Sequence, residues 1–175
     1  MPAMLKLDLA RLEREKRLRV DAEIPSDDPL WEGSDLTFRG PLRVGLVAQS
    51  TVDGGVVVRG AIDGTLEFEC RRCLEPVEWS VERDLTLVWT PIDELGSTED
   101  DGDSRTLPLS ASELDLGDAI REELILGTNR YRVCDPACRG LCPQCGTNLN
   151  EGACDCTKDE ADPRWDVLRA LKTEG

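Results

Sequence analysis

Apolar and polar residues alternate along most of the stretch from residue 36 to residue 89, which is the pattern of half-buried β-strands. Asp53-Gly54-Gly55 predicts a turn between two of these strands, and residues 70–76 predict the tip of the hairpin that joins the next two. We therefore expect an antiparallel sheet that carries Cys70 and Cys73 at the end of a hairpin. The apolar positions form three sets, each on one face of its strand: Leu42, Val44, Leu46 and Ala48; Ile62, Leu66, Phe68 and Cys70; and Val77, Trp79, Val81, Leu85, Leu87 and Trp89.

Two other stretches follow the 3.6-residue period of helices. In the first, Asp115 is a candidate N-cap and Gly127 is placed to end the helix. The second is a short helix from Asp162 to Lys172, with proline at its first helical position. We expect the first helix to pack on the sheet and the second to cover part of the core or of the cysteine-rich segment. The apolar stripes are Leu116, Ile120 and Leu124 in the first helix and Trp165, Leu168 and Leu171 in the second.

Charge is unevenly distributed along a chain whose formal net charge is -15. The first 20 residues hold six Lys or Arg against three Asp or Glu, and they are the most basic segment of the protein. We expect a solvated strand-to-turn or helical segment there, with a contact to nucleic acid or an acidic partner as the alternative. Residues 93–103 are acidic with no basic residue, a composition typical of a disordered loop.

The strong net negative charge argues against broad adhesion to DNA or to anionic lipid. No apolar run approaches the roughly 20 residues of a membrane span. Charged residues also interrupt every apolar cluster near the N-terminus, unlike the apolar region of a signal peptide. We therefore expect a cytoplasmic protein with no membrane and no DNA partner. Thiols stay reduced in that compartment, so we interpret the cysteines as metal ligands and not as disulfides.

The eight cysteines come in closely spaced pairs. Cys142-Pro-Gln-Cys145-Gly146 has the form of a zinc knuckle, in which a tight turn points two thiolates at one ion and the glycine supplies a positive φ. Such pairs, joined by longer loops, build closed tetrahedral sulfur sites. We therefore predict two zinc ions, each bound by four thiolates. The predicted ligands are Cys70, Cys73, Cys134, Cys138, Cys142, Cys145, Cys154 and Cys156.

Loop length decides which cysteines we group together. The four that follow residue 140 are close in sequence, so they can close one site at little cost in loop entropy. The second site then joins the hairpin tip, with Cys70 and Cys73, to Cys134 and Cys138. The one-residue spacer between Cys154 and Cys156 demands an extended backbone if both sulfurs are to reach one ion. An alternative grouping takes Cys138, Cys142, Cys145 and Cys154 and leaves Cys134 and Cys156 spare.

These elements predict an α+β fold. We expect an antiparallel β-sheet core with one packed helix, a cysteine-rich zinc module of the zinc-ribbon kind and a short C-terminal helix. Residues 1–132 are predicted to form the β-rich core, with the N-terminal basic segment and the acidic loop. Residues 133–175 are predicted to form the zinc-binding module and the C-terminal helix.

The residue types do not favour catalysis. The chain has no histidine, the commonest general base and the usual ligand of catalytic zinc. A four-thiolate zinc site leaves no position open for water, and the glycines at 54 and 55 lack the lysine and helix of a phosphate-binding loop. A thioredoxin-like role needs its first cysteine at a helix N-terminus, whereas this pair joins two strands. We predict that the protein is not an enzyme.

Several motifs together resemble the YceD family, the large ribosomal RNA accumulation proteins of bacteria and plastids. The resemblance covers nearly the whole chain, and it implies a non-enzymatic, metal-binding cytoplasmic protein needed for normal levels of large-subunit ribosomal RNA. The motifs are Leu66-Glu-Phe-Glu-Cys70-Arg-Arg-Cys73-Leu-Glu-Pro, Arg121-Glu-Glu-Leu, Cys134-Asp-Pro-Ala-Cys138-Arg-Gly-Leu-Cys142-Pro-Gln-Cys145-Gly-Thr-Asn-Leu-Asn, Cys154-Asp-Cys156 and Asp162-Pro-Arg-Trp165.

Three functions remain open at this point. The protein is a ribosome-biogenesis factor that touches precursor ribosomal RNA, an acidic adaptor that holds a basic large-subunit ribosomal protein or assembly factor, or a thiol redox or metal-trafficking protein. In the first case, arginines near the metal sites make the phosphate contacts. Arg71 and Arg72 are expected to point outward at the hairpin tip, since the sulfurs beside them point inward. The candidate RNA-binding residues are Arg71, Arg72, Arg130, Arg132 and Arg139.

Overall fold

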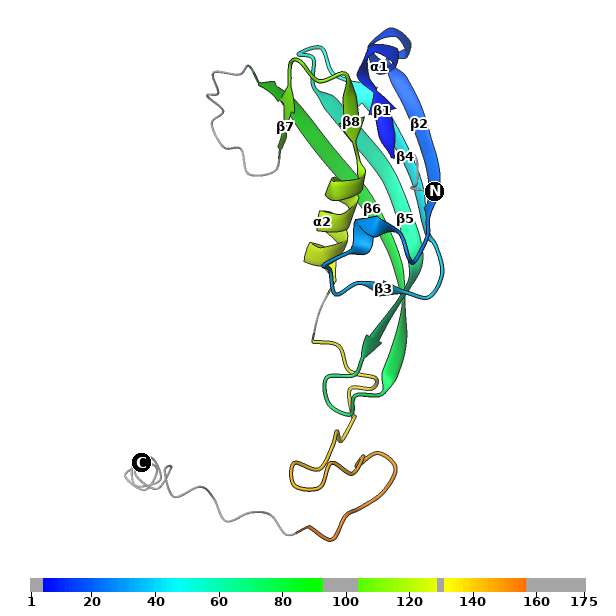
Figure 1. Cartoon of the computed structure of the whole chain (residues 1–175), viewed down its shortest axis with the longest axis vertical. Coiled ribbons are helices and arrows are strands. Elements are labelled where there is room, and N and C mark those ends of the chain that lie inside the picture. The colour runs from blue at the N-terminus through cyan, green and yellow to red at the C-terminus, as the bar shows by residue number, and fades with distance from the viewer. Residues whose placement is uncertain (1–4, 93–103, 129–130, 157–175) are drawn as a thin grey trace, which may run out of the picture.

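The computed structural model describes residues 5–92, 104–128 and 131–156 of the 175-residue chain. Figure 1 shows a twisted sheet with a shorter layer on one face and a long hairpin that extends beyond both. The elements in chain order are β1 (Lys6–Asp8), α1 (Leu9–Glu15), β2 (Arg17–Ile24), the 3-10 helix η1 (Pro29–Trp31), β3 (Thr37–Phe38), β4 (Leu42–Ser50), β5 (Val56–Glu69), β6 (Pro76–Ile92), β7 (Arg105–Pro108), β8 (Glu113–Asp115) and α2 (Gly117–Gly127).

The main sheet has six strands in the order β2-β4-β5-β6-β7, with β3 paired to β5 beyond the end of β4. Every pairing in it is antiparallel except that of β6 with β7, which is parallel. The turn at residues 53–55 and the hairpin tip at 70–75 lie where the alternating pattern predicts them, between β4 and β5 and between β5 and β6. The predicted α+β class with an antiparallel sheet core is confirmed.

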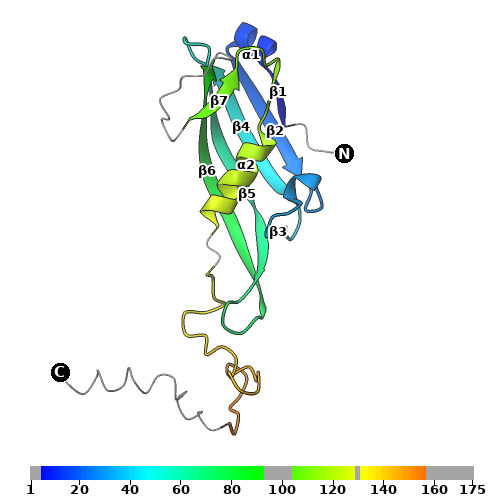
Figure 2. The same ribbon diagram turned by 60° about the vertical axis from the view of Figure 1, so that its left-hand side comes forward.

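The core lies between this sheet and a layer formed by α2, η1 and the small β1–β8 sheet, as Figures 1 and 2 show. Leu116, Ile120 and Leu124, the predicted apolar face of the helix, are buried there. Asp115 does not occupy the N-cap position, but its carboxylate accepts a hydrogen bond from the backbone N–H of Gly117 at 2.8 Å. The aspartate thus supplies an acceptor to the first turn from one position earlier than a standard cap.

The basic N-terminal segment is more deeply built into the fold than its charge predicts. Four of its five leucines, Leu5, Leu7, Leu12 and Leu18, are buried in the core, while its lysines and arginines face solvent. β1 also pairs with β8 through Leu7 and Leu114, which tethers the start of the described chain to the segment before α2. The segment is therefore a strand, a helix and a strand with one solvated side.

The β5–β6 hairpin positions the cysteines. Its strands pair continuously from Val56 and Trp89 to Glu69 and Pro76, and its far end projects past α2 to meet residues 131–156 (Figures 1 and 2). Three predicted features lie outside the described residues: the acidic loop at 93–103, Arg130, and the helix from 162 to 172. The boundary between residues 132 and 133 stays a prediction, although cysteines from both sides of it come together in the structure.

Candidate metal centres

The eight cysteines gather in two groups of four, and all eight are free thiols. In the first group, the Sγ atoms of Cys70, Cys73, Cys134 and Cys138 lie within 4.8 Å of one another. The Sγ atoms of Cys70 and Cys138 are 3.9 Å apart, and those of Cys73 and Cys134 are 3.6 Å apart. Four sulfurs at about 2.3 Å from a tetrahedral zinc ion are separated by about 3.8 Å. The geometry of the first group therefore fits a zinc ion.

The hairpin tip forms half of this first site. The N–H of Cys70 donates to the carbonyl of Glu75 at 2.8 Å, and the N–H of Leu74 donates to the carbonyl of Cys70 at 2.9 Å. Leu74 takes a left-handed conformation with a φ of 62°. This tight turn points the thiols of Cys70 and Cys73 to the same side, and both are buried.

The backbone joins the tip to the segment that carries the other two ligands. The N–H of Arg71 donates to the carbonyl of Arg132 at 3.0 Å, and the N–H of Leu141 donates to the carbonyl of Arg72 at 3.0 Å. The N–H groups of Arg72 and Cys134 also point at the Sγ of Cys70, at 3.4 and 3.3 Å. N–H groups directed at a sulfur stabilise its thiolate form, which is the form that binds metal.

The second group contains Cys142, Cys145, Cys154 and Cys156, again with all Sγ atoms within 4.8 Å of one another. Its knuckle is closed by a hydrogen bond of 2.9 Å from the N–H of Gly146 to the carbonyl of Cys142, and Gly146 has the positive φ (74°) that its position predicts. Cys145 and Cys156 are exposed, so this site is closer to solvent than the first. The two groups follow the first of the two groupings considered from the sequence.

Asn150 links the two sites, a role that the cysteine spacing does not reveal. Its Nδ2 donates to the Sγ of Cys138 at 3.3 Å, and its Oδ1 accepts from the N–H of Arg139 at 2.7 Å. The N–H of Leu149 donates to the carbonyl of Gly140 at 2.9 Å, next to this contact. The knuckle of the second group is therefore held against the ligands of the first.

The thiols of the first group have pKa values that are shifted in opposite directions. Burial raises the pKa of Cys70, but the N–H groups of Cys134, Cys73 and Arg72 outweigh it and lower the value to about 6. A hydrogen bond with Cys138, followed by burial, raises the pKa of Cys134 to about 12.

The pKa values in the second group are also shifted in opposite directions. Thr147, through its side chain and then its backbone, lowers the pKa of Cys145 to about 6, whereas the hydrogen bond with Cys145 and burial raise that of Cys156 to about 12. In each group, thiols whose pKa is raised by hydrogen bonding and burial stand beside thiols whose pKa is lowered. Four thiolates can coexist there when a cation stands between them.

The predicted RNA-binding arginines have different surroundings. The guanidinium of Arg72 does not point freely into solvent, since its Nη1 donates to the carbonyls of Pro136 and Cys138 at 3.3 and 2.9 Å. Arg132 is half-buried and lies over the ring of Trp79. Arg71 and Arg139 are exposed. Arg72 is thus exposed, as expected, but its guanidinium also holds the backbone near Cys138.

Tyr131 is a surface feature that the sequence analysis missed. Its side chain is 82% exposed, and the Cζ of Arg71 lies 5.6 Å from the centre of its ring. The signal available in the sequence was that the chain's one tyrosine stands between two arginines. An exposed aromatic ring paired with an arginine beside the first metal group is a surface on which a nucleic acid base can stack.

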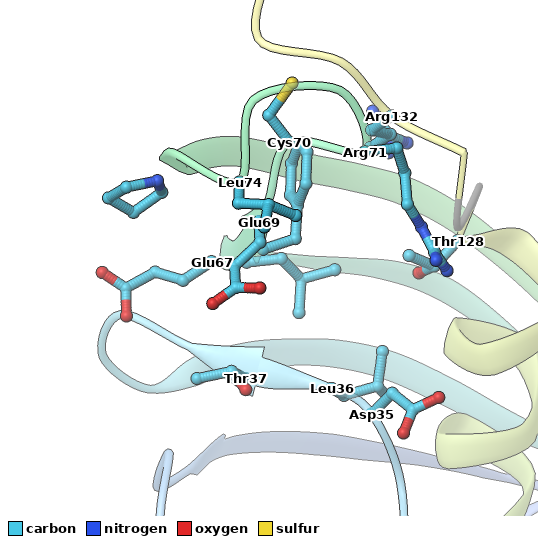
Figure 3. A pocket seen from close by; sticks show the side chains of 13 residues that line it. Asp35, Leu36, Thr37, Glu67, Glu69, Cys70, Arg71, Leu74, Thr128 and Arg132 are labelled. Atoms are coloured by element: carbon cyan, nitrogen blue, oxygen red, sulfur yellow. The ribbon is translucent and has the colours of Figure 1, made fainter. Parts of the chain in front are cut away.

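A pocket of about 560 Å³ lies beside the hairpin tip (Figure 3). It lies between the segment around Thr37 and the end of β5, and Arg71 and Arg132 line it from the side of the hairpin tip. Its lining contains both apolar and acidic side chains, with Leu36 and Phe68 beside carboxylates. The acidic residues in its lining are Asp35, Glu67 and Glu69. The pocket thus lacks the uniformly basic lining of a phosphate site.

The sequence of the chain matches a known protein family. The sequence profile of the family described as "Large ribosomal RNA subunit accumulation protein YceD" matches residues 58–172, which include all but the first two residues of the β5–β6 hairpin and all eight cysteines. The chain belongs to the YceD family. This confirms the resemblance of its motifs to that family, which is named for accumulation of the large ribosomal RNA subunit.

Two plastid relatives carry the family name. "Large ribosomal RNA subunit accumulation protein YCED homolog 1, chloroplastic" of Arabidopsis thaliana is 32% identical over 140 residues, which cover 66% of this chain and 44% of the relative. The protein of the same name from Zea mays is 28% identical over 130 residues, covering 59% of this chain and 44% of the relative. The chain therefore spans less than half the length of these plastid proteins.

A bacterial relative covers more of the chain. An uncharacterised protein of Mycobacterium tuberculosis (strain H37Rv) is 30% identical over 168 residues, which cover 94% of this chain and 79% of the relative. The comparison with solved structures finds no match. Among the described residues, no helix is long and apolar enough to cross a membrane.

Proposed function

We propose that this protein is a non-enzymatic, zinc-binding factor of ribosome biogenesis that supports accumulation of large-subunit ribosomal RNA in the cytoplasm. Membership of the YceD family supports the link to ribosomal RNA. The grouping of eight free thiols into two sets of four is the observation that carries the metal-binding part of the proposal. Reduced thiols in such number also fit a cytoplasmic location.

The zinc ions have a structural role in this account. One would be held by Cys70, Cys73, Cys134 and Cys138, the other by the four cysteines that follow. Zinc supplies a crosslink between thiolates and leaves no open position for a reacting water. The first site ties a hairpin tip to ligands more than 60 residues further along the chain, which removes much of the entropy of an unfolded loop.

The surface beside the first site supports direct contact with RNA. Arg71 and Tyr131 form an exposed cation–π pair, and the exposed Arg139 lies in the segment whose backbone Arg72 holds. Tyr131 offers a stacking platform for an unpaired base, and the arginines offer charge to neighbouring phosphates. The net charge of -15 of the whole chain repels RNA in general, so binding depends on this small surface.

The adaptor function stays as the second candidate. The acidic pocket lining of Asp35, Glu67 and Glu69 and the net charge favour a basic protein partner, such as a large-subunit ribosomal protein. In that case ribosomal RNA levels depend on the protein that this chain holds, and the chain itself makes no contact with RNA.

A pull-down from cell extract, with and without ribonuclease, separates the two candidates. Direct RNA contact predicts that large-subunit components are lost when ribonuclease is added, whereas the adaptor predicts that one basic protein remains bound. A parallel measurement uses purified protein and single-stranded fragments of precursor ribosomal RNA. Tyr131→Ala should weaken binding at every salt concentration, and Arg71→Ala should reduce the salt slope by about 0.7. Equal binding by the parent and both variants contradicts the RNA contact.

A further inference from the structure

β2 ends the main sheet on one side, as Figures 1 and 2 show. All eight of its residues pair with β4, from Arg17 opposite Gln49 to Ile24 opposite Leu42. Of the strands in the described ranges, none pairs with the other edge of β2. This leaves an edge of eight residues with backbone groups available to another strand.

Of the devices that usually protect such an edge, β2 has charged side chains on its solvent face but lacks the others. No proline interrupts the strand, no charged residue points inward, and its register with β4 contains no bulge. The inward positions are apolar: Leu18 and Ile24 are buried, while Val20 and Ala22 are half-buried at the margin of the core. A further strand at this edge would cover the two half-buried side chains.

The charges on the solvent face of β2 are arranged in a self-complementary order. Arg17 and Arg19 stand on one side of Val20, and Asp21 and Glu23 stand on the other. If two copies pair antiparallel with Val20 facing Val20, Arg19 of each copy faces Asp21 of the other, and Arg17 faces Glu23. The two-fold symmetry repeats each pair, so every charged side chain of the strand faces its opposite.

Other registers lack this match. A shift of two residues in one direction places Arg19 opposite Arg19, and in the other direction it places Asp21 opposite Asp21. Like charges directly opposite each other are destabilising. A shift of one residue turns the apolar face of one strand to the solvent face of the other. The sequence of β2 therefore specifies one pairing with itself.

We propose that the free edge of β2 is a homodimer interface, in which two copies pair antiparallel about Val20 and continue the main sheet across the two-fold axis. The Arg19–Asp21 contact within one chain, at 2.6 Å between Nε and Oδ2, becomes part of an alternating row of charges across both copies. A pairing of two short strands buries less than the standard interface of about 1,600 Å², so the dimer forms in a concentration-dependent manner. The proposal depends neither on zinc nor on ribosomal RNA.

The test measures molecular mass by sedimentation velocity on the full-length, metal-loaded protein from about 1 µM to about 1 mM. The parent should pass from monomer to dimer within this range. Arg19→Asp and Asp21→Arg should each remain monomeric, because each places like charges opposite each other. These positions face Val47 and Gly45 of β4, so neither substitution places like charges opposite each other within the sheet. Each one does replace the Arg19–Asp21 contact within the strand by a like-charge pair, which the double substitution removes again. The double substitution Arg19→Asp/Asp21→Arg restores every opposite-charge pair and should dimerise as the parent does.

Mixing the two single variants is the sharpest part of the test. One strand then carries two acidic residues and the other two basic residues at positions 19 and 21, so a heterodimer should form from two proteins that are monomeric alone. The interface is refuted by a parent that stays monomeric throughout, by single variants that dimerise like the parent, or by a mixture that stays monomeric.

Hydrogen exchange of the unmodified protein provides a readout that needs no variant. Amides of residues 17–24 should exchange more slowly as protein concentration rises, since pairing protects the outward N–H groups. Exchange in β2 that does not change with concentration overturns the proposal.

Discussion

The guanidinium of Arg132 lies over the indole ring of Trp79, with its Cζ 3.1 Å from the centre of the ring. Its Nε is buried without a hydrogen-bond partner, and burial lowers the pKa of the side chain. The contact holds the segment that leads to Cys134 against β6. Arg132, one of the candidate RNA-binding residues, is therefore placed to act in packing.

Replacing Arg132 tests this role. Arg132→Ala should lower the free energy of unfolding by about 1 to 2 kcal/mol, because it removes a partly desolvated cation–π contact. Urea unfolding followed by tryptophan fluorescence measures the change. Arg139→Ala is the matched control: Arg139 is exposed, so its loss should change stability by about 0.5 kcal/mol or less. Equal effects of the two substitutions would argue against a packing role.

Arg72 should matter for metal retention more than Arg71, although the two are neighbours. Arg72→Ala removes the hydrogen bonds to the carbonyls of Pro136 and Cys138, which hold the loop between two ligands of the first group. We expect about a tenfold faster release of one metal ion to a chelator, by analogy with other residues that support metal ligands. Arg71→Ala should release metal at the parent rate. Identical rates for both variants would contradict the assigned contact.

Asn150 lies in sequence between Cys145 and Cys154 of the second group but donates to a sulfur of the first. Asn150→Ala should therefore weaken metal binding at the first group, by about 10- to 100-fold. Cobalt titration, which reports thiolate ligation by absorbance, can follow the two sites separately in variants that lack Cys145 or Cys73. The prediction fails if the affinity loss appears at the second group alone.

Position 60 requires glycine because the backbone of the neighbouring strand approaches it closely. A Cβ at this position would lie 2.1 Å from the carbonyl oxygen of Gly45 and 2.8 Å from the Cα of Leu46. Gly60→Ala should thus destabilise the fold by about 3 kcal/mol or more, since backbone atoms must move. Gly45→Ala meets only the Asp21 side chain at 3.7 Å and should cost about 1 kcal/mol or less. Thermal unfolding of the two variants compares them directly.

Alternation of apolar residues predicted the central strands because the sheet has one buried and one solvated face. Leu42, Val44, Leu46 and Ala48, one of the predicted faces, are all buried. The same pattern could not predict the parallel pairing of β6 with β7 or the small β1–β8 sheet. Both depend on which distant segments meet in space, and strands of three or four residues carry too little period to indicate a partner.

The candidate site was also predictable only in part. The spacing of the cysteines predicted that all eight gather in two groups of four, since closely spaced thiolate pairs are recognisable in sequence. The supporting contacts of Arg72 and Asn150 were not predictable, because each joins residues that only the folded chain brings together. Their position beside the cysteines made Arg72 and Arg132 candidates for RNA binding, whereas guanidinium groups can also satisfy carbonyls or cover an aromatic ring.

We propose that each of the two groups of four cysteines holds one zinc ion. Elemental analysis of the purified protein, combined with titration of accessible thiols before and after chelation, tests it most directly. We predict two zinc ions per chain, with all eight cysteines protected until the metal is removed. One zinc ion per chain with four freely reacting cysteines, or eight reactive thiols and no metal, would contradict it.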